Sequence, residues 1–119
     1  MYQIKEVTLR HGKHIRNHLI IEFNDSKYAI LSEFLMTDAP MFQRELMQEV
    51  KEVLEGQREV VKGSGNRTSW NISIQHAVIE DLFLYMDQNI PSYPTCMIET
   101  STLYDIMFEW FQAQDNFKK

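Results

Sequence analysis

Residues 59–75 read EVVKGSGNRTSWNISIQ, and the alternation within this segment decides the expected fold. Trp70, Ile72 and Ile74 are spaced two apart, which is the period at which strand side chains share one face. We expect residues 59–62 to form a second short strand on the other side of the GSGN sequence. Glycine and asparagine adopt positive φ readily, so this sequence can turn the chain. The segment therefore predicts a β-hairpin.

The N-terminal part of the chain predicts three more strands. Residues 4–9 and 15–23 show strand periodicity on either side of a turn at residues 11–13. A second turn follows at residues 24–26, where short polar side chains bond their own backbone. We expect residues 28–35 to return as a third strand, which would complete an antiparallel meander.

A helix is expected over residues 40–54. Either Thr37 or Asp38 can cap its free amide groups, and Pro40 is tolerated in a first turn. The apolar side chains of this segment recur at helical spacing, and Gly56 is placed to end the helix. Its opposite face carries glutamates, which we expect to face solvent; the alternative is that they contact a cationic partner.

A second helix is expected over residues 101–113, with Thr100 or Ser101 as its cap. Its apolar side chains cover an arc of roughly 200° at helical periodicity, which is wider than one sheet face buries. Two interpretations of Tyr104 and Phe108 remain open. Either both side chains belong to the core, or they face a second protein, which would make this helix the interface of a homodimer.

The remaining elements complete an α+β domain. Residues 77–85 predict a strand, although the same residues would suit a helical turn, and residues 96–99 predict a short last strand. The prolines of residues 86–95 indicate a loop. The expected order is βββ-α-ββββ-α over a single domain of residues 1–119. Its mostly antiparallel sheet would carry both helices on one face.

Composition restricts the location and the partners. The net charge is −5, and the single cysteine cannot form an internal disulfide, which favours the cytoplasm. The N-terminus lacks the pattern of a signal peptide, and no apolar run approaches the length of a membrane span. We therefore expect a cytoplasmic protein without a membrane partner.

The C-terminal half has an unusual charge pattern. Residues 68–117 contain seven Asp and Glu but no Lys or Arg. Such a surface disfavours nucleic acid, which is bound mainly through cations, and favours a basic protein partner. Trp70 and Trp110 are assigned to the core. The residues expected to bind the partner are acidic or aromatic: Glu80, Asp81, Tyr85, Asp87, Tyr93, Asp105 and Glu109.

Candidate chemical groups are few. The histidines at positions 11, 14 and 18 lack the further donors that a metal site needs, so we expect no metal and no cofactor. Cys96 lies in an apolar strand, where a thiol is normally inert. His76 with Glu80 or Asp81 could act as a general acid or base, which keeps a small hydrolase as an alternative. The leading expectation is a protein without enzymatic activity.

Two groups of residues carry a resemblance to known proteins. LIIEFND at residues 19–25 is followed by ILSEFL at residues 30–35, and MIET at residues 97–100 is followed by Leu103, Ile106 and Trp110. These segments resemble small bacterial α+β proteins similar to the acidic immunity proteins that accompany secreted toxins. The resemblance implies an immunity (antitoxin) protein that binds a toxin domain, such as a nuclease. The alternative is a self-associating structural or interaction module.

Overall fold

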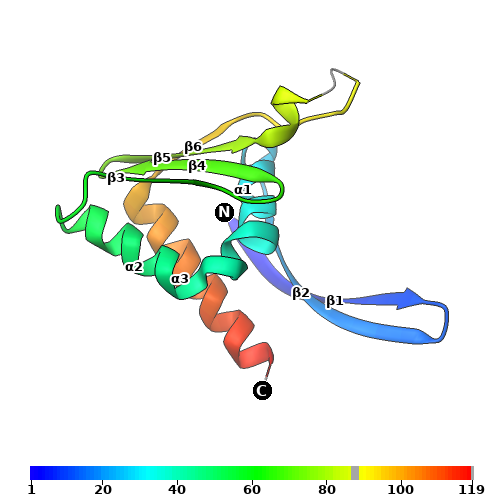
Figure 1. Cartoon of the computed structure of the whole chain (residues 1–119). Helices are drawn as coiled ribbons and strands as arrows, with labels where there is room; N and C mark the ends of the chain where they lie inside the picture. Colours follow the sequence, from blue (N-terminus) through cyan, green and yellow to red (C-terminus); the bar gives the residue numbers. More distant parts are fainter. Residues whose placement is uncertain (87–88, 119) are drawn as a thin grey trace.

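The four-stranded antiparallel sheet at the centre of the molecule contains the predicted hairpin (Figure 1). The computed structural model describes residues 1–86 and 89–118. The strands of this sheet are neighbours in chain order: β3 (Val60–Ser64), β4 (Thr68–Ser73), β5 (His76–Asp81) and β6 (Cys96–Glu99).

Both long helices, α2 (Gln43–Leu54) and α3 (Thr100–Phe117), cover one face of this sheet (Figure 1). The core lies between the helices and the sheet, and it contains both tryptophans as predicted. Trp110 is 0% exposed, and its indole N–H donates to the backbone carbonyl of Leu35 at 2.7 Å. The predicted α+β class, with two long helices on a mostly antiparallel sheet, is confirmed.

The predicted third strand is wrong, because residues 28–35 are largely helical. The chain forms α1 (Ala29–Glu33), a π-helical turn (Phe34–Asp38) and a 3₁₀ turn (Ala39–Phe42) before α2 begins. Four apolar side chains with the i, i+1, i+4, i+5 spacing of one helix face are fully buried: Ile30, Leu31, Phe34 and Leu35. Burial of this face against the core therefore outweighs the strand continuation that the preceding turn suggested.

The first two strands, β1 (Tyr2–His11) and β2 (His14–Phe23), form a separate two-stranded sheet that projects from the body (Figure 1). The predicted turn at residues 11–13 is present, and Gly12 takes a positive φ of 61° in it. Because residues 28–35 do not return as a strand, the hairpin stands apart from the central sheet. Every residue from 8 to 18 is exposed.

The β3–β4 hairpin needs its glycines for space, whereas the sequence suggested positive φ. Among the described residues, only Gly12 and Gly56 have positive φ. A Cβ at Gly63 would lie 2.7 Å from the indole of Trp70, and a Cβ at Gly65 would lie 2.3 Å from the carboxylate of Asp38. Both glycines therefore permit a close approach of side chain to backbone.

The helix ends agree only partly with expectation. Gly56 follows α2 with φ 79°, as predicted. Neither predicted N-terminal cap forms: Asp38 binds the β3–β4 turn, and the hydroxyl of Thr100 donates to the carbonyl of Ser73. The last helix also continues four residues beyond its predicted end at residue 113, to Phe117.

Residues 77–85 combine the two structures that their sequence allowed. Strand β5 ends at Asp81, and a 3₁₀ turn follows over Leu82–Tyr85. The Asp81 side chain caps this turn by accepting a hydrogen bond from the Phe83 amide at 3.0 Å. Across the described residues, no helix is both long and apolar enough to span a bilayer.

Candidate functional site

The segment after β5 is anchored by a buried ion pair between Arg67 and Asp81. Asp81 is 0% exposed, and its carboxylate accepts two hydrogen bonds from the Arg67 guanidinium, at 2.9 and 3.0 Å. The remaining acceptor positions are filled by the backbone amides of Phe83 and Tyr93, at 3.0 and 2.9 Å. One carboxylate therefore holds both ends of the segment that joins β5 to β6.

The Arg67 side chain also contacts two aromatic rings of this segment. Its guanidinium carbon lies 4.0 Å from the ring centroid of Phe83 and 5.4 Å from that of Tyr93. Cations are attracted to the faces of aromatic rings, most strongly where water is excluded. Arg67 thus connects the beginning and the end of the segment from the neighbouring β3–β4 turn.

The protonation of this ion pair follows from its contacts. Burial alone would raise the pKa of Asp81, but the hydrogen bonds from Arg67, Tyr93 and Phe83 outweigh it and hold that pKa below its ordinary value. The hydrogen bonds to Asp81 raise the pKa of Arg67 further. The pair is therefore fully charged at neutral pH. Asp81 was expected to contact a partner, but the structure gives its carboxylate an internal role.

A second buried carboxylate, Asp38, fixes the turn that carries Arg67. It accepts hydrogen bonds from the backbone amides of Asn66, Arg67 and Thr68 and from the Thr68 hydroxyl, at distances of 2.7 to 3.1 Å. The amide and hydroxyl of Thr68 are buried, so they would otherwise be left unpaired. Asp38 thereby orients the backbone of Arg67, and through it the segment that follows β5.

The surface built on this anchor combines exposed aromatic groups with the half-buried carboxylate of Glu80 on the sheet face opposite the helices. Glu80 is placed on that face by the strand alternation, because its neighbours Ile79 and Asp81 are buried. The hydroxyl of Tyr85 donates to the Glu80 carboxylate, which raises the pKa of Tyr85, and Tyr85 is 72% exposed.

Other exposed apolar side chains lie around this pair. We call the following set the β5–β6 surface: Glu80, Leu84, Tyr85, Met86, Tyr93 and Met97. Val78 is paired with Met97 across β5 and β6, which places Met97 on the same outward face.

An acidic cleft adjoins this surface at Tyr93. It has a volume of about 390 Å³ and is lined by Tyr93 together with the carboxylates of Glu22, Asp25 and Glu33. Glu22 pairs with Lys5 at 3.0 Å, and Asp25 lies 3.9 Å from Lys27. The sequence reasoning missed this cleft, because Glu22, Asp25 and Glu33 lie in the part of the chain that was expected to form the N-terminal meander.

The other predicted partner-binding residues lie elsewhere. Asp105 and Glu109 belong to α3, on the helical side of the sheet, so they are separated from Glu80 by the sheet. The Tyr2 hydroxyl donates to Glu109, and burial together with this carboxylate raises the pKa of Tyr2 to about 12. Asp87 lies outside the described residues. The structure therefore brings together Glu80, Tyr85 and Tyr93 and separates Asp105 and Glu109 from them.

The side chains considered for catalysis have other contacts. His76 begins β5, whereas Asp81 ends it and is bound by Arg67, so these two groups do not converge. Glu80 is occupied by the Tyr85 hydroxyl. Cys96 is 2% exposed, and burial raises the pKa of its thiol to about 11. In the part of the chain that the structure describes, no group of three His, Cys, Asp or Glu side chains could hold a metal ion.

Comparison with known proteins identifies no relative of this chain. No protein-family model, curated protein or solved structure matches the chain. The function must therefore be argued from the surface itself.

Proposed function

We propose that this protein is an immunity (antitoxin) protein, which binds a basic toxin domain, such as a nuclease, and blocks its active site. The observation that carries the proposal is the acidic cleft of Glu22, Asp25 and Glu33, which is continuous at Tyr93 with the exposed aromatic β5–β6 surface. Carboxylates accelerate the encounter with a basic cleft, and aromatic side chains supply much of the binding energy once water is excluded.

The anchoring of this surface supports the same function. Arg67, Asp81 and Asp38 fix both ends of the segment that carries Tyr85 and Tyr93 before any partner arrives. A surface held in its binding conformation loses less conformational entropy on association, so it binds more tightly for the same contacts. An inhibitor that must neutralise a toxin quickly benefits from both properties.

The proposal is tested with the protein encoded beside this chain, or with one that copurifies with a tagged copy. In Glu33→Lys and Glu80→Lys variants, the association rate at low salt should fall about tenfold or more, and its salt dependence should weaken. Tyr85→Ala should instead act mainly on dissociation, because an aromatic contact forms only in the bound complex.

The controls separate a local effect from a change in net charge. Glu59→Lys alters net charge equally at an exposed position outside the surface, so it should leave the association rate nearly unchanged. Reversal of Asp105 measures the contribution of the acidic groups on α3. If the Glu33 and Glu80 variants associate no more slowly than the Glu59 control, the proposed surface is wrong.

A further inference from the structure

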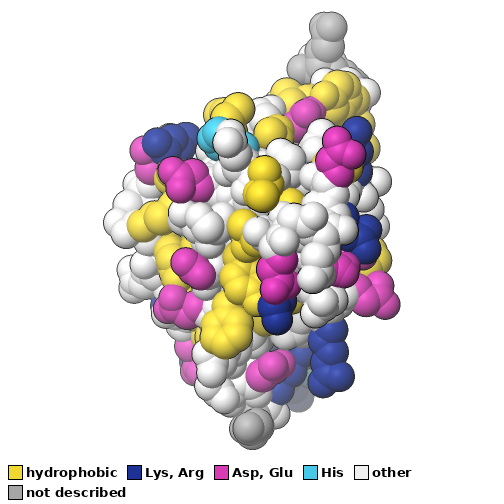
Figure 2. Space-filling model, turned by 90° about the vertical axis from the view of Figure 1, so that its left-hand side faces the viewer, with side chains coloured by type: hydrophobic (Ala, Val, Ile, Leu, Met, Phe, Trp, Pro, Cys, Tyr) yellow, Lys and Arg dark blue, Asp and Glu magenta, His cyan; other side chains and the backbone are white. Residues whose placement is uncertain are grey.

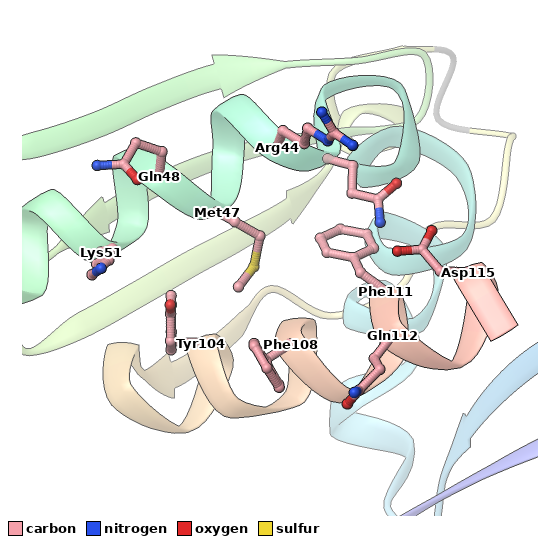
Figure 3. Close-up of a pocket in the computed structure, with 10 residues that line it drawn as sticks. Arg44, Met47, Gln48, Lys51, Tyr104, Phe108, Phe111, Gln112 and Asp115 are labelled. Atoms are coloured by element: carbon pink, nitrogen blue, oxygen red, sulfur yellow. The ribbon is translucent and has the colours of Figure 1, made fainter.

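A groove between α2 and α3 leaves aromatic side chains open to solvent on the helical side of the molecule (Figure 3). It has a volume of about 480 Å³, and its apolar part consists of Met47 from α2 with Tyr104, Phe108 and Phe111 from α3. Phe108 is 56% exposed, whereas Phe111 is buried and forms part of the core. The groove is thus an extension of the core that the described residues do not cover.

Charged side chains flank this apolar strip in a definite pattern. Arg44 and Lys51 project from α2 beside the groove, and Asp115 lies on α3 at the end near Arg44 (Figure 3). Within the described part of the chain, the side chains of Arg44 and Lys51 make no ion pair or hydrogen bond. The other side of α2 carries Glu45 and Glu49, which line a different hollow. The α2 edge of the groove is therefore cationic.

The α3 edge has the opposite character. Helix α3 contains Asp105, Glu109 and Asp115 but no Lys or Arg. The groove thus has Arg44 and Lys51 along its α2 edge and Asp115 on its α3 edge, on either side of an aromatic strip. Figure 2 shows such a strip of hydrophobic side chains between charged groups, on the side of the molecule where α2 ends and α3 begins.

We propose that this groove is the interface of a symmetric homodimer, in which α2 of each copy packs over α3 of the other. A two-fold axis that runs along the groove produces this arrangement. It places the α2 edge of one copy over the α3 edge of the other, and it keeps the Arg44 end of one copy at the Arg44 end of the other. Arg44 then faces Asp115 of the second copy, and Lys51 faces the half of α3 that carries Tyr104 and Asp105. The contact is self-complementary, as a closed two-fold interface requires.

The aromatic strip supplies the centre of this interface. Two copies of Phe108 meet at the axis and are screened from water by Met47 and Tyr104 of both chains. Exposed aromatic side chains in a central pocket with arginine beside them have the composition of interface hot spots. The proposal is independent of the immunity function, since the β5–β6 surface lies on the opposite face of the sheet and stays open in the dimer.

The test is sedimentation velocity over a range of protein concentrations, with the whole chain and without any partner. The wild type should form a dimer. Phe108→Ser should weaken dimerisation by about 30-fold or more, which is the effect of losing a hot-spot residue. Because Phe108 is exposed, the far-UV circular dichroism and the melting temperature of the Phe108→Ser variant should remain close to those of the wild type.

A charge exchange makes the test specific to the proposed arrangement. A variant with Arg44→Glu and Lys51→Glu has two anionic edges, and a variant with Asp105→Lys and Asp115→Lys has two cationic edges. Each alone should be monomeric, whereas an equimolar mixture should form heterodimers. A control with Arg58→Glu and Lys62→Glu carries the same change of net charge outside the groove and should dimerise like the wild type.

Three results would overturn the proposal. The first is a wild type that stays monomeric at every concentration tested. The second is a dimer that persists in Phe108→Ser and in both charge variants. The third is a dimer that is lost only when the cations of the projecting hairpin, Arg10, Lys13 and Arg16, are reversed, which would place the interface on that hairpin.

Discussion

Gly65 and Asp38 approach each other so closely that residue 65 has no room for a side chain. A Cβ built on Gly65 would lie 2.3 Å from the Asp38 carboxylate and 2.7 Å from its Cβ. The carboxylate cannot retreat, because it is held by the amides of residues 66–68 and by the Thr68 hydroxyl. This contact joins the turn before α2 to the turn that positions Arg67.

We predict that Gly65→Ala destabilises the protein by about 1–3 kcal/mol, the usual cost of overpacking a tight site. The added methyl group must displace Asp38 from at least one of its donors. Urea unfolding followed by circular dichroism measures the effect. Ser64→Ala at the exposed neighbouring position is the matched control, and it should stay within about 0.5 kcal/mol of the wild type. Equal stability of the two variants would contradict the close contact.

We predict a larger loss when the buried ion pair is broken from one side. Arg67→Gln leaves the Asp81 carboxylate buried without its cation, which typically costs about 3–5 kcal/mol. Arg58→Gln removes an arginine from an exposed pair with Glu52 and should cost less than about 1 kcal/mol. Combining Arg67→Met with Asp81→Asn should recover part of the loss, since no buried charge then remains. The asparagine carbonyl can still accept from the amides of Phe83 and Tyr93. A double variant less stable than Arg67→Gln would show that the pair itself is needed.

The pKa of Asp81 predicts a specific dependence of stability on pH. That pKa lies below its ordinary value of 3.8 in the folded protein, so on acidification the unfolded chain takes up the proton first. The stabilisation that Asp81 contributes is therefore fully present above about pH 4, and it is lost as the pH drops through the folded pKa. Asp81→Asn should lower stability at neutral pH and flatten this acid-side slope. Urea midpoints between pH 2 and 6 provide the measurement, and an unchanged slope in the variant would refute the assignment.

The sequence predicted those parts of the fold that depend on periodicity within one segment. The β3–β4 hairpin, α2 and α3 follow from the spacing of apolar side chains. Apolar spacing also indicates a helix over residues 28–35, since Ile30, Leu31, Phe34 and Leu35 follow a helical spacing. The prediction of a strand at residues 28–35 instead followed from the preceding turn, although such a turn can lead into either a strand or a helix.

The candidate site depends on contacts between distant segments, and these were harder to predict. Asp38 has the sequence context of a helix cap, yet its partners lie 28 to 30 residues away. Arg67 and Asp81 become neighbours only through the β4–β5 register, in which Thr68 pairs with Asp81. The count of charges along residues 68–117 grouped Asp81, Asp105 and Glu109 with Glu80. The fold, however, buries Asp81 and places Asp105 and Glu109 on the other side of the sheet.

The single cysteine provides a sensitive report on the packing of β6 against the core. Burial raises the pKa of Cys96 from 9.0 to about 11, so its reactive thiolate at pH 8 is about 100-fold scarcer than in the unfolded chain. We predict that iodoacetamide modifies the native protein at least 100-fold more slowly than the urea-unfolded protein, because steric exclusion adds to the pKa effect. A variant with Cys96→Ala and Ser101→Cys moves the thiol to an exposed position and should react at nearly the unfolded rate. If native Cys96 reacted within tenfold of that control, β6 would have to open frequently, and the tight packing of β6 against the core would be wrong.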